Sequence, residues 1–188
     1  MVRNVERRTA LVDAAIEVLA RDGARGLTFR AVDQEAGVPG GTASNYFPSR
    51  DDLLHQAGEH VHVRLTPNPD VVAQTLAAPR DKTLVRRFMH ELLDRVRHDR
   101  TGYLALLELR LEATRRPGLR ATLTRMITAN VEANVAFHLD AGLPGDRTDV
   151  VLLYLGMTGL LVEHLTLPDV LPDLDALVDA LVDRLPTG

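Results

Sequence analysis

Three side chains of the segment 50–65 have the spacing of a metal site. His55, Glu59 and His62 stand at i, i+4 and i+7, which places them on one face of a helix. Two imidazoles and a carboxylate are ligands that zinc accepts, so a metal-dependent helical enzyme stays open as an alternative function. Histidines on a surface helix produce the same pattern without a metal. We therefore predict no metal ligands and no cofactor.

Other catalytic chemistry lacks a signature. The sequence has no cysteine, which excludes disulfides and thiolate metal sites. It also has no G-x-S-x-G nucleophile turn and no glycine-rich phosphate loop. We predict no catalytic residues and no enzymatic activity.

Small polar residues at 40–46 offer chemistry of another kind. Thr42 and Ser44 carry hydroxyls that donate or accept, and Asn45 can pair with the edge of an adenine. Tyr46 and Arg50 follow within reach of a phosphate. Thr28 begins a second short helix whose first amides can bind another phosphate. These residue types suit the major groove of DNA.

The elements that must position these residues are helices. Apolar residues recur at helical spacing almost throughout, and strand-like alternation is absent, which predicts an all-α fold of about nine helices. Gly23 and Gly37 suit helix stops. Thr28 and Ser49 suit N-caps, with Asp52 as the capping-box partner of Ser49. The expected ranges are 5–22, 29–36, 41–47, 50–65, 81–98, 102–115, 117–141, 147–166 and 173–185.

The helices at 29–36 and 41–47 enclose a glycine-containing turn, which predicts a helix-turn-helix. The wording of this segment resembles the DNA-binding segment of the TetR family of repressors. The matching positions are Gly23, Gly26, Thr28, Ala36-Gly37-Val38, Thr42, Tyr46-Phe47, Arg50 and Leu53. The resemblance covers about residues 8–55, and it implies a TetR-like fold with an N-terminal three-helix domain and a C-terminal helical bundle.

The resemblance implies a set of DNA-binding residues, with Phe47 in the core. They are Thr28, Arg30, Gly41, Thr42, Ser44, Asn45, Tyr46 and Arg50. Three positions depart from the family pattern. Ser44 replaces a usual Tyr, Arg50 replaces a usual Lys, and Asp33 replaces a small apolar residue. Asp33 disturbs the packing of the two helices unless its carboxylate accepts hydrogen bonds from the amides that open the second helix.

The resemblance also implies an effector-binding half. We predict a DNA-binding domain at 1–49, a connecting helix at 50–65, and a ligand-binding and dimerisation domain at 66–188. The connecting helix is expected to carry any signal between them. Candidate contacts to a small-molecule effector of unknown identity are Phe88, Leu92, Arg110, Met126, Asn130, Asn134, Phe137, Tyr154, Met157 and His164. An inward stripe on helix 117–141 includes Leu119, Leu123, Asn130 and Asn134.

The last two helices predict a homodimer. Residues 150–165 are apolar nearly all round, so this helix either crosses a large core or meets another subunit. The last helix has a leucine stripe, Leu171, Leu174, Leu177, Leu181 and Leu185. Two copies of this pair make a four-helix bundle. Gly156 and Gly159 allow close helix approach, either within one subunit or between two.

The overall composition agrees with a regulator of this kind. Residues 1–50 hold seven arginines against six acidic residues, whereas the chain carries a net charge of -4. The N-terminus is charged and no uncharged run is long enough to span a membrane, so we predict a cytoplasmic protein without membrane contact. The predicted function is a ligand-responsive regulator that binds a double-stranded, palindromic DNA operator, most simply a repressor. The alternatives are the metal-dependent enzyme and a helical interaction module that binds no operator.

Overall fold

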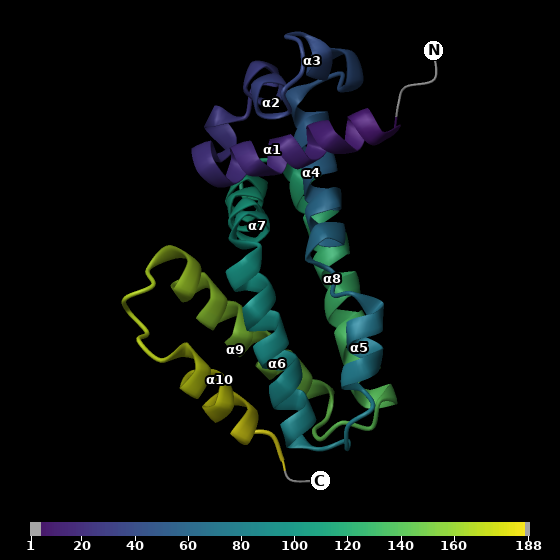
Figure 1. The fold of residues 1–188 in the computed structure, drawn as a ribbon, viewed down its shortest axis with the longest axis vertical. Helices are drawn as coiled ribbons and strands as arrows, with labels where there is room; N and C mark the ends of the chain where they lie inside the picture. The colour runs from purple at the N-terminus through teal and green to yellow at the C-terminus, as the bar shows by residue number, and fades with distance from the viewer. Residues whose placement is uncertain (1–4, 187–188) are drawn as a thin grey trace. The chain divides into compact units, whose positions relative to one another are not determined.

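A computed structural model of the chain describes residues 5–186 (Figure 1). These residues form ten α-helices and no strand. The all-α fold class is thereby confirmed. Helix α5 was not expected; it begins at Pro69, since proline is tolerated in the first turn of a helix. The ends of the predicted domains, residues 1–4 and 187–188, lie outside the described residues. The helices are α1 Val5–Gly26, α2 Phe29–Glu35, α3 Thr42–Tyr46, α4 Arg50–Leu65, α5 Pro69–Thr75, α6 Lys82–His98, α7 Arg100–Ala113, α8 Pro117–Asp140, α9 Arg147–Thr166 and α10 Leu174–Asp183.

The described chain forms two compact units. Unit 1 comprises residues up to Thr66 together with Asp99–Met126, and unit 2 comprises Pro67–His98 with Ile127 onward. Helix α8 contributes its first part to unit 1 and the rest to unit 2. Unit 1 therefore holds α1–α4, α7 and the start of α8, while unit 2 holds α5, α6, α9, α10 and the end of α8.

Unit 1 is built around α1, which packs against α2, α4 and α7. The buried side chains come from each of these helices and include Leu11, Ile16, Leu19, Val32, Leu53, Leu54, Ala105 and Leu109. The regular part of α1 ends at Gly23, which has a left-handed φ of 68° and so confirms the predicted stop. One core thus holds the first four helices to α7.

Unit 2 combines a narrow apolar seam with a row of charged pairs between α6 and α10. On α10, the fully buried residues are Val178 and Val182. Of the leucine stripe expected at the dimer face, Leu174 and Leu185 are buried within the chain, whereas Leu177 is 36% exposed. Acidic side chains on α10 pair with basic ones on α6: Arg86 with Asp179 and Asp183, His90 with Asp175 and Asp179, and Arg97 with Asp175. We call this set the α6–α10 ladder.

Helix α8 confirms part of its expected inward stripe and corrects the rest. Leu119 and Leu123 are buried in unit 1, and Asn130 is half-buried in unit 2. Asn134 is exposed, whereas Val135 and His138 are buried in its place. Apolar residues lie around most of this helix, so spacing alone does not fix which side faces the core.

Helix α9 keeps an apolar face outside the fold of its own chain. Leu152 and Leu155 are 58% and 56% exposed. Gly156 packs closely against Leu181 of α10, while a side chain added at Gly159 would meet open space. By length and composition α9 is the one described helix that could cross a membrane, although it carries Arg147, Asp149 and Glu163.

Candidate DNA interface

Helices α2 and α3 form the predicted helix-turn-helix. The Thr28 hydroxyl accepts a hydrogen bond from the Ala31 amide, 3.1 Å away, which confirms it as the N-cap of α2. Gly37 ends α2 with a left-handed φ of 62°. Gly41 adopts φ 89° directly before α3, a conformation that strains any residue with a Cβ. These turns fix the direction in which α3 leaves α2.

Asp33 joins the two helices through its carboxylate. The residue is only 2% exposed, and its oxygens accept hydrogen bonds from the amides of Gly41 and Ala43, both at 2.7 Å. Asp33 therefore accepts hydrogen bonds from the amides that open α3, as compatible packing of the two helices requires. The carboxylate fills a position where the family usually has a small apolar side chain and gains two charge-assisted hydrogen bonds there.

The polar side chains of α3 differ in what they can still offer. The Thr42 hydroxyl donates to the Pro39 carbonyl, and the Ser44 hydroxyl donates to the Gly41 carbonyl at 2.9 Å. Each oxygen then keeps only acceptor capacity, which suits the amino groups of adenine or cytosine. Asn45 is exposed, and its amide forms no hydrogen bond with any described residue. It retains both donor and acceptor, as pairing with adenine requires.

The end of α3 is fastened from α1. Phe47 is 1% exposed, as predicted for a core residue, and the Arg8 guanidinium lies 5.0 Å from its ring centre. Arg8 also donates to the Tyr46 carbonyl at 3.1 Å and to the Gln56 side chain at 2.8 Å. Since Gln56 belongs to α4, one arginine links three helices.

Arg50 is turned inward rather than toward open solvent. Its guanidinium donates to the Ala24 carbonyl, and its Nε is buried without a partner among the described residues. The Ala24 amide in turn donates to Glu108 of α7 at 2.8 Å. The peptide groups around Ala24 thus join α1, α4 and α7. A phosphate contact by Arg50 stays a prediction and requires the side chain to leave this carbonyl.

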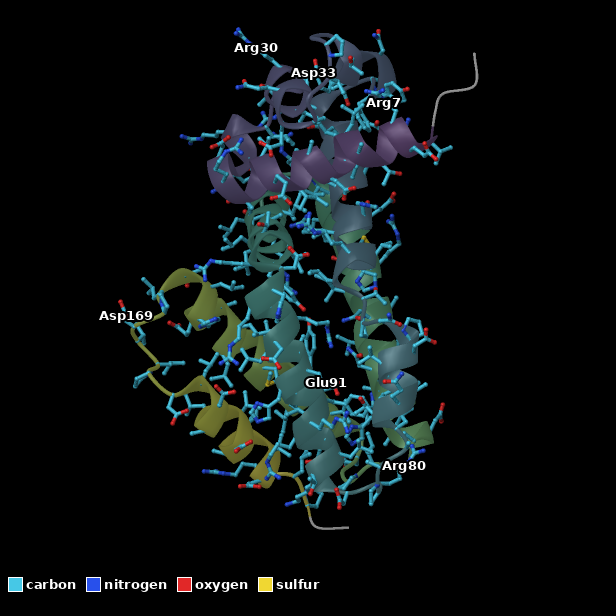
Figure 2. All side chains as sticks on the ribbon, viewed as in Figure 1. Arg7, Arg30, Asp33, Arg80, Glu91 and Asp169 are labelled. Atoms are coloured by element: carbon cyan, nitrogen blue, oxygen red, sulfur yellow. The ribbon has the colours of Figure 1, made fainter. Side chains whose placement is uncertain are left out.

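Arg30 remains as a cation of the predicted DNA set with no ion pair among the described residues. It is exposed, and Figure 2 shows its side chain pointing away from α2. Arg21, by contrast, pairs with Asp22 and Glu35, and the hydrogen bond to Asp22 raises the pKa of Arg21 most. Arg30 is therefore better placed than Arg21 to meet a phosphate.

Two family models match the chain. "Bacterial regulatory proteins, tetR family" matches residues 11–57, and "Tetracyclin repressor-like, C-terminal domain" matches residues 80–187. The chain belongs to the TetR family. Membership of this family confirms the predicted function of a ligand-responsive, DNA-binding transcriptional regulator.

Two solved structures that cover nearly the whole of this TetR-family chain, and one repressor that covers less of it, are similar to it. A TetR-family member from Streptomyces coelicolor A3 is 30% identical, with 97% of this chain and 99% of that chain covered and a TM-score of 0.70. The multidrug binding protein EbrR, complexed with ethidium, is 28% identical over 96% and 99% of the two chains, with a TM-score of 0.64. The nicotine-responsive repressor HdnoR of Paenarthrobacter nicotinovorans is 25% identical, with 72% of this chain and 68% of that protein covered.

The predicted effector contacts of this TetR-family chain fall in both units. Arg110 and Met126 belong to unit 1, and the other eight belong to unit 2. Within unit 2, Phe88 and Phe137 meet edge to face with ring centres 5.5 Å apart, and Met157 is buried. Two surface cavities of about 280 and 250 Å³ lie in unit 1, and neither is lined by any of these ten residues.

The histidine pattern on α4 gains no support as a metal site. The His55 ring nitrogen lies 3.1 Å from the Thr122 hydroxyl of α8, while Glu59 and His62 are exposed. No group of three or more potential ligands comes together within residues 5–186.

Asp99, the N-cap of α7, has a lowered pKa. Burial alone would raise the pKa of Asp99, but hydrogen bonds from Arg64 of α4 and from the Gly102 amide outweigh it and lower that pKa.

Proposed function

We propose that two copies of this chain bind a palindromic operator as a repressor and release it when a small molecule occupies the C-terminal half. The observation that carries the proposal is the exposed Asn45 amide on a recognition helix fixed at both ends. One end is held by Asp33 and the other by Arg8. A side chain with unused hydrogen-bonding groups on a fixed short helix is what reading of base edges requires.

The other proposed contacts follow from what each group still has to offer. Arg30 and the N-terminus of α2 behind Thr28 would meet phosphates. Thr42 and Ser44 would accept from base amino groups, and Gly41 leaves the backbone open to close approach. Tyr46 and Arg50 complete the proposed set at the end of α3 and the start of α4.

The proposed dimer uses the face of α9 that this chain leaves uncovered. Leu152, Leu155 and Gly159 follow one another at helical spacing, and Leu177 of α10 is also exposed. We call Leu152, Leu155 and Gly159 the α9 apolar face. Burying one leucine side chain completely gains roughly 1.5–3 kcal/mol, so covering the exposed parts of Leu152 and Leu155 contributes to association with a second copy. The same pairing would cover the apolar helix α9 in a cytoplasmic protein, with no membrane involved.

The proposed division of labour follows the sequence: residues 1–49 read DNA, α4 connects, and residues 66–188 bind the effector and the second copy. The effector would lie near Phe88, Leu92, Phe137, Tyr154 and Met157. Candidate polar partners within unit 2 are Asn130, Asn134 and His164. Helix α4 is not the sole route for a signal, because α7 packs directly on α1 within unit 1.

The test has two stages. Purified protein is first used to select binding sites from randomised duplex DNA, which should return an inverted repeat with half-sites about one or more helical turns apart. Operator affinity is then measured with and without ethidium, proflavin and nicotine as probes. A true effector should lower it roughly 5- to 150-fold, the range of typical coupling energies.

The outcomes separate the parts of the proposal. Selection of no preferred sequence would contradict operator binding. A preferred sequence without inverted symmetry would contradict the dimer. If a probe raises the thermal stability but leaves operator affinity unchanged, it is bound but is no effector. If none of the probes, nor a wider small-molecule screen, releases DNA, the ligand-switch part fails while the DNA-binding part stands.

A further inference from the structure

The recognition helix α3 lacks a cap of its own. It has five residues, and Gly41 at its N-cap position has no side chain to accept a hydrogen bond. Helices this short are unstable unless something outside them fixes their first turn. An N-cap side chain normally accepts from the amide two or three positions later. In α3 these amides belong to Ala43 and Ser44.

Asp33 of α2 supplies the missing cap from another helix. One carboxylate oxygen accepts from the Ala43 amide and the other from the Gly41 amide. The intervening Thr42 amide donates to the Pro39 carbonyl at 3.2 Å. The amides of Gly41, Thr42 and Ala43 at the start of α3 thus all have partners, two of them in a single side chain. Asp33 forms no ion pair with any described cation, so its charge is compensated mainly by these amides.

We propose that Asp33 is the positioning residue that sets the sequence specificity of this protein. It holds α3 at the angle from which Asn45 reaches a base edge, and it touches no DNA itself. This inference rests on the proposed operator binding. Nonspecific affinity comes mostly from cations meeting phosphates and needs no exact placement of α3. Specific affinity depends on that placement, so loss of the carboxylate should act on specificity first.

Simple electrostatics predicts the opposite sign, which makes the proposal testable. Removing a negative charge from a DNA-binding unit should strengthen binding to every duplex, because phosphates repel carboxylates. If Asp33 positions α3, its replacement should instead weaken binding to the selected operator. The two effects can be read separately by measuring the operator and a random duplex at one salt concentration.

The experiment compares Asp33→Asn with Glu35→Gln in the full-length protein. Both variants remove one negative charge from α2, but Glu35 pairs with Arg21 at 2.6 Å and forms no hydrogen bond to α3. In Asp33→Asn the amide nitrogen faces a backbone donor, so only one of the two hydrogen bonds can remain. Asp33→Ala removes both acceptors and provides a graded third case.

We expect the operator-to-random affinity ratio to fall about tenfold in Asp33→Asn, which corresponds to about 1.4 kcal/mol. It should fall further in Asp33→Ala and stay unchanged in Glu35→Gln. An unchanged ratio in a folded Asp33→Asn protein would overturn the inference alone. Failure of the unsubstituted protein to prefer any sequence would overturn it together with operator binding.

A second measurement needs no variant and so does not depend on folding of the substituted proteins. Amides in the first turn of a helix have no partner within it and exchange rapidly with solvent. In the unsubstituted protein, the Gly41 and Ala43 amides should be protected from hydrogen exchange. Rapid exchange at both would contradict the carboxylate cap.

Discussion

Units 1 and 2 bury their apolar residues to different degrees. In unit 1, α1 lies among helices that cover it, and its residues Leu11, Ile16 and Leu19 are 0–1% exposed. In unit 2, Leu152 and Leu155 of α9 remain more than half exposed, and polar side-chain pairs such as Arg97–Asp175 hold α10 to α6. Exposed apolar residues occur in both units, but in unit 2 Leu152 and Leu155 lie one turn apart on a single helix, where we propose that a second copy binds.

The largest expected effect comes from disrupting the proposed contact between two copies at the α9 apolar face. Leu152→Glu combined with Leu155→Glu should yield a monomer and lower operator affinity roughly 10²- to 10⁴-fold, because the two half-sites are no longer bound by linked units. Sedimentation velocity and operator titration measure the two quantities.

Leu111→Glu is the matched control for the dimer test. Leu111 is 59% exposed, close to the values of Leu152 and Leu155, but it lies on α7 in unit 1. It should leave the dimer intact. Dimers that persist in the double variant would place the interface elsewhere.

A smaller effect distinguishes two kinds of contact within unit 1. Asn45→Ala should relax preference at one base position and cost roughly 1–3 kcal/mol, whereas Arg30→Ala should weaken binding to all sequences about equally and reduce its salt dependence. Both are measured by selection from a randomised site and by titration at two salt concentrations. A binding profile unchanged by Asn45→Ala would remove this side chain from the groove.

Arg50→Ala is expected to act differently from Arg30→Ala. The Arg50 guanidinium donates to the Ala24 carbonyl, so its loss should lower the free energy of unfolding as well as DNA affinity. Equal stability of the two variants would show that the Arg50 side chain leaves this carbonyl in solution.

The smallest effect concerns the α6–α10 ladder. The hydrogen bond from Arg97 holds the pKa of Asp175 below its ordinary value of 3.8. A carboxylate with a lowered pKa stabilises the fold above that ordinary value, and the contribution disappears as the pH falls through the lower, folded-state value. Arg97→Ala should therefore cost less than about 1 kcal/mol at pH 5, and the difference from the unsubstituted protein should shrink by pH 3.

Urea unfolding at the two pH values measures this difference. Arg87→Ala is the control, because Arg87 pairs with Glu91 on its own helix rather than with α10. A cost for Arg97→Ala that does not change with pH would mean that the arginine acts through packing.

Local signals allowed the first four helices to be predicted closely. Gly23, Thr28, Gly37 and Ser49 each occupy the cap or stop expected of them. Such features depend on neighbours in the chain, so sequence reveals them. The capping box of α4 is only half formed: Ser49 accepts from the Asp52 amide, whereas the Asp52 carboxylate accepts from Gln56.

Contacts between distant segments could not be predicted in this way. Glu108 meets Ala24 across 84 positions, and no local pattern marks either residue. On α8, apolar residues on more than one side leave the buried side ambiguous, which is why Asn134 was assigned to the wrong face. Which side of such a helix is buried depends on the segment that packs against it, and that segment lies far away in the sequence.

The backbone amide of Ala24 gives this protein a built-in spectroscopic reporter. This amide donates a hydrogen bond to the Glu108 carboxylate of α7, and the carbonyl of the same residue accepts one from the Arg50 guanidinium of α4. A shift of α7 by a fraction of an ångström would change the length of that hydrogen bond and with it the chemical shift of one resolved amide. Following this single resonance during a ligand titration would register movement of α7 before any DNA is added.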